Sequence, residues 1–443
     1  MTICFVTNMY YAETGGIPYY YRTLSSLLAE AGHIAIVLTQ GDRDSYETDK
    51  LSKKKEGVQV VTLNETYRKY YLKYRSYYRR GGYEVYDWIA IGKAAREWLK
   101  KNSHEYGIEL VCVQDYGGMG AFLCDPGLPP IMIEGHSALV QLGRFNGEVS
   151  GEQLELLKKM ELAAFRCADS IITHSYFNQA DLRQYTDRPI LFARAPLKIN
   201  IQPLAEPSGE IIVISSLQQA KGSVFMAELL RELKKRNLSM TIHWYGSDTY
   251  TAPGGLKMSE WLAAHYADIW NQEFSWQGAV SPQAALQKMA EASLILIPSV
   301  WDTFNYCGPE AVLLQRPVVI SQNAGCSYLF EKHSGVKVLP ANDLKAWADF
   351  LSNQTAGSAF CKVPKPESAG FTTAYFSAHS IVSERIGMYE LVLSARKNQP
   401  GKGVPDLSFL NKKHTLPRKI FFAIKYQMKK LLKRNRNEAF FCK

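Results

Sequence analysis

The chain of 443 residues lacks several features that would assign it to common classes of protein. No stretch approaches the roughly 20 consecutive apolar residues that a membrane-spanning helix needs. The eight cysteines are scattered singly, without any Cys-x-x-Cys pair, so a reduced cytosolic compartment fits better than a disulfide framework, and no structural metal is expected. The first residues have no basic segment and soon reach Asn8 and Glu13, which argues against a signal peptide. These absences predict a cytoplasmic protein, soluble or peripheral at a membrane.

Most of the chain also lacks net charge. Residues 1–400 contain 40 basic and 40 acidic side chains, whereas residues 401–443 contain 12 basic side chains against two acidic ones. The net charge of +10 is therefore confined to the C-terminal tail. An apolar content of 46% is ordinary for a folded protein, and the length leaves room for two domains with full cores.

Short apolar runs alternate with amphipathic stretches along both halves of the chain, which indicates parallel sheets covered by helices. We predict an α/β protein with two Rossmann-like, doubly wound domains facing a central cleft, at residues 1–200 and 205–376. The proline-rich stretch between Pro196 and Gly209 is typical of a linker. We expect a further helix at residues 377–397 and a basic tail at 401–443. Predicted strands span residues 2–7, 34–39, 58–63, 110–114, 130–134, 170–173, 190–193, 210–215, 240–245, 273–276, 293–297, 318–321 and 336–339.

Two acidic residues lie at one strand-to-helix junction of the second domain. Asp302 follows the apolar run 294–298, and Glu310 lies in the first turn of a helix predicted at 309–315. In open α/β sheets, ligands bind beyond the carboxyl ends of the strands, close to free helix N–H groups. Carboxylates at such a place can accept hydrogen bonds from vicinal hydroxyls, as a sugar would offer. A loop cap and a first-turn acid are the structural alternative.

The segment around these acids resembles the acid-x7-acid signature of retaining glycosyltransferases with the two-domain B-type fold (GT-B), the family of sucrose and glycogen synthase relatives. Pro298-Ser299, Phe304, Glu310-Ala311 and Pro317-Val318-Val319 agree with that pattern. Three positions depart from it: Asp302 replaces a glutamate, and Asn305 and Gln315 replace glycines. Asn tolerates the left-handed backbone that a glycine would supply.

Three further segments extend the resemblance. Gly15-Gly16 lies where the first strand meets the first helix; alone it favours an ordinary tight turn over a ligand-binding loop. His136 follows the strand at 130–134, where a single histidine is usually structural. Lys221-Gly222 is the counterpart of the family's Gly-Arg-Leu-x-x-x-Lys-Gly, with Ser216 at the arginine position; unaided, Lys221 would be taken for a solvated charge.

The resemblance implies transfer of a sugar from a nucleotide diphosphate donor to an acceptor hydroxyl, with retention of the anomeric configuration. It assigns donor binding to Gly15, Gly16, Ser216, Lys221, Gly222, Phe304, Asn305, Tyr306 and Glu310, and a catalytic part to His136, Lys221 and Asp302. Lys221 and helix amides would neutralise the diphosphate, Glu310 would hold the ribose, and Asp302 and the amides of 304–306 would hold the sugar. The nucleotide sugar is the co-substrate, and neither a cofactor nor a divalent metal is expected.

Two departures keep other functions open. Ser216 and Asp302 are consistent with a catalytically silent scaffold, and a sugar-nucleotide epimerase could use the same two domains. A nicotinamide dehydrogenase is disfavoured because the first glycine loop is not Gly-x-Gly-x-x-Gly.

Two basic segments suggest an anionic membrane surface as a partner. Residues 67–80 hold six tyrosines and six basic side chains, a mixture that also suits a loop packing back on the protein. In residues 417–436, Ile420, Ile424, Met428, Leu431 and Leu432 would share one helical side, with Lys425, Lys429 and Lys433 along another. Binding to a protein partner or packing on the catalytic body is the alternative, and no nucleic-acid motif is present. We expect a peripheral enzyme at the inner face of the cell membrane, with a saccharide or lipid-linked acceptor in polysaccharide or glycolipid assembly.

Overall fold

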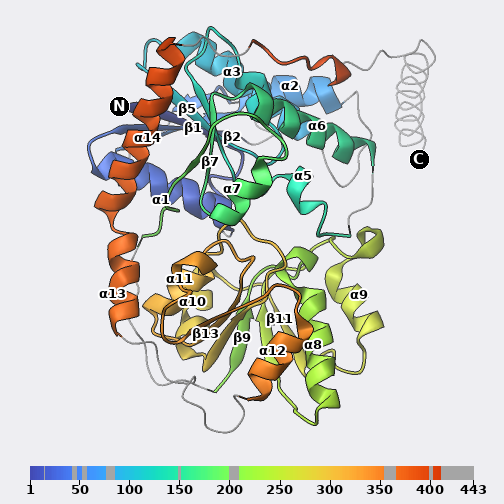
Figure 1. Ribbon diagram of the computed structural model, residues 1–443. Coiled ribbons are helices and arrows are strands. Elements are labelled where there is room, and N and C mark those ends of the chain that lie inside the picture. The colour runs from blue at the N-terminus through green and yellow to red at the C-terminus, as the bar shows by residue number, and fades with distance from the viewer. Residues whose placement is uncertain are drawn as a thin grey trace, which may run out of the picture. The chain divides into compact units, whose positions relative to one another are not determined.

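A computed structural model describes residues 1–13, 15–41, 47–51, 57–75, 85–147, 151–198, 209–353, 366–398 and 403–410. Residues 1–198 form an N-terminal lobe and residues 209–353 a C-terminal lobe, each built on its own sheet (Figure 1). Both lobes belong to one compact unit, Met1–Pro405. The tail from Asn411 onward and most of the expected linker, 199–208, lie outside the described residues.

The N-terminal sheet has eight strands in the order β3-β4-β2-β1-β5-β6-β7-β8. All neighbours pair in parallel except β3, which is antiparallel to β4 and was not predicted from the sequence. β1, β5 and β6 are buried throughout, as strands covered on both faces must be. The strands are β1 (Thr2–Thr7), β2 (Ile34–Gln40), β3 (Lys50–Leu51), β4 (Val58–Leu63), β5 (Leu110–Gln114), β6 (Ile131–Glu134), β7 (Ser170–Thr173) and β8 (Ile190–Phe192).

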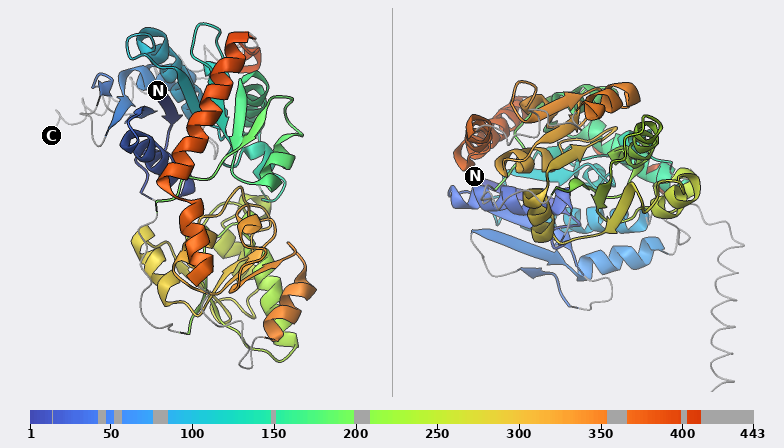
Figure 2. Two further views of the ribbon diagram at one scale, coloured as in Figure 1. Left: turned by 60° about the vertical axis from the view of Figure 1, so that its left-hand side comes forward. Right: turned by 90° about the horizontal axis from the view of Figure 1, so that it is seen from below.

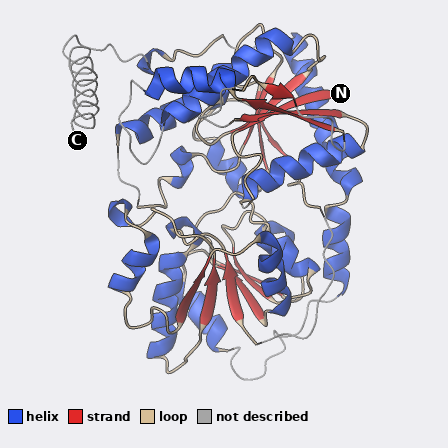
Figure 3. Cartoon of the chain, turned by 180° about the vertical axis from the view of Figure 1, so that it is seen from behind, coloured by secondary structure: helices blue, strands red, loops and turns tan. Residues whose placement is uncertain are grey.

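Helices cover both faces of this sheet (Figure 3). α1 turns Tyr20, Tyr21, Leu24 and Leu28 into the core at helical spacing. The helices are α1 (Gly16–Glu30), α2 (Glu65–Arg75), α3 (Val85–Asn102), α4 (Gly120–Leu123), α5 (Leu139–Leu142), α6 (Glu152–Cys167) and α7 (Tyr176–Leu182).

The C-terminal sheet is wholly parallel, in the order β11-β10-β9-β12-β13-β14. Its strands are β9 (Ile211–Ile214), β10 (Ile242–Tyr245), β11 (Phe274–Gly278), β12 (Leu294–Ile297), β13 (Val318–Ser321) and β14 (Val336–Leu339). The α-helices are α8 (Ser223–Lys235), α9 (Met258–His265), α10 (Pro282–Glu291), α11 (Cys307–Leu313) and α12 (Leu344–Ser352). Short 3-10 turns are η1 (Gln219–Lys221), η2 (Pro253–Gly255) and η3 (Ser327–Leu329), with η5 (Ser408–Leu410) near the end of the described chain.

Two further helices, α13 (Pro366–Tyr375) and α14 (Ala378–Asn398), follow the C-terminal lobe. α14 returns to the N-terminal lobe and runs beside α1 (Figures 1 and 2). Arg385 of α14, fully buried, bonds to the Glu134 carboxylate of β6 at 3.2 Å and donates to the Tyr20 hydroxyl at 2.7 Å. A paired charge inside the protein therefore ties α14 to the N-terminal sheet.

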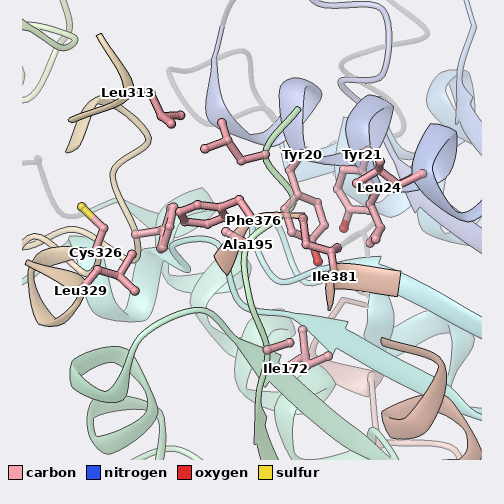
Figure 4. Packing of buried hydrophobic residues seen from close by; sticks show 14 of the residues in the cluster. Tyr20, Tyr21, Leu24, Ile172, Ala195, Leu313, Cys326, Leu329, Phe376 and Ile381 are labelled. Atoms are coloured by element: carbon pink, nitrogen blue, oxygen red, sulfur yellow. The ribbon is translucent and has the colours of Figure 1, made fainter. Parts of the chain in front are cut away.

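One hydrophobic cluster continues through both lobes. It joins Tyr20 and Leu24 of α1 to Phe304 of the C-terminal lobe and to Phe376 and Ile381 of the returning segment (Figure 4). This shared core explains why the two lobes and α14 form a single unit, because removing the returning segment would expose apolar surface on both lobes.

The structure confirms the predicted strands, each within two residues of its expected ends. It corrects the expectation for the cysteines: Cys124 and Cys167 form a disulfide, because α4 and α6 pack together and bring their Cα atoms to 6.0 Å. The two cysteines are 43 residues apart, so their pairing depends on tertiary packing and cannot be predicted from the local spacing of cysteines.

The tyrosine-rich segment is a helix, α2, as far as Arg75. Tyr67, Tyr71 and Tyr74 are buried, and Tyr70 donates to Glu97 of α3 at 2.8 Å. These four side chains pack back on the protein, which favours the alternative to a membrane-facing segment; residues 76–80 lie outside the described residues. Within the described chain, no helix is long and apolar enough to cross a membrane.

Candidate active site

The acid after β12 and the lysine before α8 form an ion pair. Lys221 Nζ lies 2.7 Å from Asp302 Oδ2, and the Asn305 side-chain amide donates to the same oxygen at 3.0 Å. The Asp302 side chain is 8% exposed and that of Lys221 is 22% exposed, so the pair is partly withdrawn from water. Both residues stand at the carboxyl edge of the parallel sheet, because η1 follows β9 and residue 302 follows β12.

In the loop 302–306, Asn305 replaces a glycine of the family pattern and has the backbone conformation that a glycine would favour. Asn305 has φ 73°, in the left-handed region, as the sequence predicted for an asparagine at this place. Phe304 is buried and contacts the rings of His174 and Tyr306 edge-on. The Tyr306 hydroxyl is buried and has no hydrogen-bond partner among the described residues, and burial raises its pKa well above the usual value.

Glu310 lies in the first turn of α11, which begins two residues before the predicted start. Its side chain is partly exposed, and no described residue forms a hydrogen bond or ion pair with its carboxyl. Desolvation by the surrounding groups raises the pKa of Glu310 to about 8. The carboxyl is thus available to a ligand, and mostly neutral at pH 7.

Close packing next to the ion pair leaves room only for a glycine at position 222. Gly222 has φ 87°, and a Cβ at this position would lie 2.1 Å from the carbonyl oxygen of Pro298. This contact sets η1 against the end of β12, which places Lys221 beside Asp302. Ser216 follows β9 and is half-buried; no hydrogen bond involves its side chain within the described chain.

The glycine loop of the N-terminal lobe meets the loop 302–306 of the C-terminal lobe. Gly15 is the N-cap of α1 and Gly16 its first residue, and a Cβ on Gly16 would be 3.9 Å from the Tyr306 ring. The Tyr19 ring contacts Tyr306 edge-on at 5.0 Å. The N-terminus of α1, with its free N–H groups, therefore lies next to residues 304–306.

His136 follows β6, as predicted, and is held by an acid that the sequence did not single out. The Asp115 carboxylate, after β5, accepts the N–H groups of His136 and Ser137 at 3.0 Å. The His136 carbonyl accepts from Thr303 of the other lobe. Its ring packs against Tyr20 at 4.4 Å, and burial, together with Arg385, lowers the pKa of His136 to about 3. The ring is therefore neutral at physiological pH.

A second histidine, His174, follows β7 as His136 follows β6. Its Nδ1 lies 3.0 Å from the Ala193 carbonyl oxygen, which can only accept, so Nδ1 carries the hydrogen and Nε2 is an acceptor. Nε2 is buried without a partner among the described residues. Burial, then Arg385, lowers the pKa of this histidine well below its usual range. The sequence alone did not single out His174, although it directly follows the strand predicted at 170–173.

Another acid, Glu161 of α6, organises the loops beside His136. Its carboxylate accepts the N–H groups of Gly117, Leu139 and Val140 at 3.0 Å. Burial raises the pKa of Glu161 to about 8, although the three N–H donors oppose the shift. No periodicity in the sequence distinguishes this acid from its solvated neighbours on the same helix.

The structure thus joins Lys221, Asp302 and Asn305 by direct bonds and sets Gly16 against Tyr306. His136 reaches the C-terminal lobe through its main chain, to Thr303. Two lobes, each built on a mainly parallel sheet and joined through loops at their strand ends, define the class: the fold is that of the GT-B glycosyltransferases.

Comparisons with known proteins agree with this class. Residues 208–354 match the family model described as glycosyl transferases group 1, and this segment contains Lys221, Asp302 and Glu310. The C-terminal lobe therefore contains a group 1 glycosyltransferase domain, which indicates a glycosyltransferase enzyme. No protein of curated function matches the sequence.

Solved structures resemble the whole fold. Sucrose-phosphate synthase from Thermosynechococcus elongatus is 17% identical, with a TM-score of 0.67 over 89% of this chain and 99% of that one. The alpha,alpha-trehalose 6-phosphate synthase from Burkholderia multivorans is 14% identical, with a TM-score of 0.58 over 90% and 99%. A trehalose-6-phosphate protein from E. coli bound with UDP-2-fluoro glucose is 13% identical, with a TM-score of 0.57 over 91% and 100%.

Proposed function

We propose that the enzyme transfers a sugar from a nucleotide diphosphate donor to an acceptor hydroxyl and retains the anomeric configuration. The observation that carries the proposal is the Lys221–Asp302 pair at the carboxyl edge of the C-terminal sheet. Glu310, in the first turn of the helix that follows, has a carboxyl without a partner among the described residues. All three residues lie in the segment that matches the group 1 family. The similar E. coli protein, which was bound with UDP-2-fluoro glucose, supports a nucleotide-sugar donor.

Each residue has a role that follows from its chemistry. The Lys221 ammonium has three N–H donors, so it can bond to a phosphate oxygen while it keeps its bond to Asp302. The negative charge on the leaving diphosphate would be stabilised there and by the free amides of α1 beside Gly16. Glu310 would accept hydrogen bonds from the ribose hydroxyls and, when protonated, could donate one to them.

The sugar would lie against the loop 302–306. We propose that Asp302 and the amides of 304–306 bind its hydroxyls, with His136 on the side of the N-terminal lobe. A neutral imidazole can accept a hydrogen bond from a sugar hydroxyl without carrying charge, which suits a ring whose pKa is lowered to about 3. Fixed cations and helix amides would perform the charge neutralisation, so we expect no divalent metal requirement.

A donor screen tests the proposal. Purified enzyme is incubated with a panel of nucleotide sugars, with and without EDTA, and released nucleoside diphosphate is measured. We expect one donor to be consumed, and Glu310→Ala to reduce that rate at least tenfold by removing the ribose contact. Glu331→Ala, at an exposed site, is the matched control.

Consumption of the donor without a second sugar-bearing product, as when the donor is converted to an isomer, would instead indicate an epimerase. The absence of donor binding in calorimetry would indicate a silent scaffold and refute the proposal.

For the cellular setting, we propose a peripheral enzyme at the cytoplasmic face of the membrane with a saccharide or lipid-linked acceptor. The proposal is supported by the basic, amphipathic pattern of residues 417–436, in which cations near an anionic surface each contribute on the order of 1 kcal/mol.

A further inference from the structure

The loop that follows α5 crosses to the C-terminal lobe. In the segment 142–147, Asn146 Oδ1 accepts the N–H of Ala220 at 3.0 Å. Gly147 N–H donates to the Thr251 carbonyl at 2.9 Å. Phe145 stacks on the buried Trp301, with ring centroids 5.9 Å apart and planes at 15°. The N-terminal lobe is therefore bonded to the C-terminal lobe by side chain and main chain together.

Ala220, whose N–H is bound by Asn146, is connected to both Lys221 and Asp302 through the chain and through main-chain hydrogen bonds. The Ala220 carbonyl accepts from the N–H groups of Val300 at 2.9 Å and Trp301 at 3.1 Å. Lys221 follows Ala220 in the chain, and Asp302 follows Trp301. Both polar main-chain groups of Ala220 are thus engaged, one from the facing lobe and the other from the loop that carries Asp302.

We propose that Asn146 is a positioning residue for the Lys221–Asp302 pair. The Asn146 carbonyl fixes the Ala220 peptide, which fixes the loop 300–302 in turn. Asn146 is 8% exposed, so water cannot readily replace its carbonyl, and without it the Ala220 N–H would be buried and unsatisfied. The geometry of the pair then depends on docking of the segment 142–147, which couples the two lobes to the site.

A substitution at Gly147 can test by steric clash whether the geometry of the ion pair depends on docking of the segment 142–147. A Cβ at position 147 would lie 2.5 Å from the main-chain nitrogen of Pro253 and 2.7 Å from its Cα. Main-chain atoms cannot rotate away, so Gly147→Ala must lift the segment from the C-terminal lobe. Gly151 offers a matched control, because its backbone is extended and a Cβ there would meet no atom within 4 Å.

The first readout needs no substrate. Lysines of the full-length protein are acylated under limiting acetic anhydride, and modification is measured by mass spectrometry. Asn146→Leu, which removes the acceptor at similar size, and Gly147→Ala should raise the modification of Lys221 severalfold, because an amine released from its ion pair is more accessible. Asn146→Asp, which keeps an acceptor oxygen, and Gly151→Ala should match the wild type. The half-buried Lys93 of the N-terminal lobe reports any general loosening of the fold.

The second readout rests on the proposed function. With the donor found in the screen, Asn146→Leu and Gly147→Ala should lower kcat about ten- to a hundredfold with little change in donor KM, since the misplaced groups act on the leaving diphosphate. Unchanged Lys221 modification overturns the inference whether or not transfer is observed. Raised modification with an unchanged kcat also overturns it, because the contact is then only structural. Failure of the proposed function is separate, since it appears as a wild-type enzyme without turnover.

Discussion

Replacement of Glu310 by glutamine should remove the contribution of this carboxyl to the pH dependence of folding stability. Desolvation by the surrounding groups raises the pKa of Glu310 to about 8, whereas the same carboxyl in the unfolded chain titrates near its ordinary value of 4.5. Between these pH values the folded protein binds more protons than the unfolded one. The folded state therefore has its full stability below about pH 4.5 and loses it as pH rises towards 8.

The magnitude follows from the width of this window. Each pH unit inside it costs about 1.4 kcal/mol, so the wild type should have lost roughly 3 kcal/mol from this group by pH 7. The N-terminus of α11 favours the charged form by about 0.5 kcal/mol, which makes that figure an upper estimate. Glutamine has nearly the same shape and does not titrate.

The assay is denaturant unfolding of the wild type and Glu310→Gln in parallel from pH 5 to pH 9. Burial also raises the pKa of Asp115 to about 6 and that of Glu161 to about 8, so both proteins should lose stability with rising pH. Their difference isolates Glu310: it should grow in favour of the variant up to about pH 8 and then level off. Glu331→Gln, at an exposed site, should follow the wild type. Parallel curves for the wild type and Glu310→Gln would refute the reasoning.

Two further predictions concern the returning helix and the tail. Arg385→Met leaves the Glu134 carboxylate buried without its charged partner and should lower the free energy of unfolding by about 3–5 kcal/mol. Arg385→Met combined with Glu134→Gln should recover much of that loss. Equal losses in both variants, measured by denaturant unfolding, would contradict the pairing. A variant ending at Leu410 should not sediment with vesicles of phosphatidylcholine and phosphatidylglycerol that bind the full chain, and undiminished sedimentation would contradict a membrane role for residues 417–436.

Much of the fold was readable because it depends on local patterns. Strands buried on both faces are near-continuous apolar runs, so β1, β5, β12 and β13 were located with small errors at their ends. The positive φ of Asn305 agrees with the family glycine that it replaces and with the tolerance of asparagine for the left-handed region. The prediction that Lys221, Asp302 and Glu310 share one site needed the resemblance to a family, because each short segment by itself also fits a purely structural role.

What the sequence by itself determined is therefore the order of strands and helices and the set of polar residues delivered to their ends. Only the tertiary structure decided which of them meet. Arg385 and Glu134 are 251 positions apart, and Asn146 and Ala220 are 74 apart. Such contacts arise from the way whole lobes and the returning helix pack, and the burial that gives His136 and Glu310 their shifted pKa values has the same origin. No local window of sequence contains that information, because burial is a property of the assembled fold.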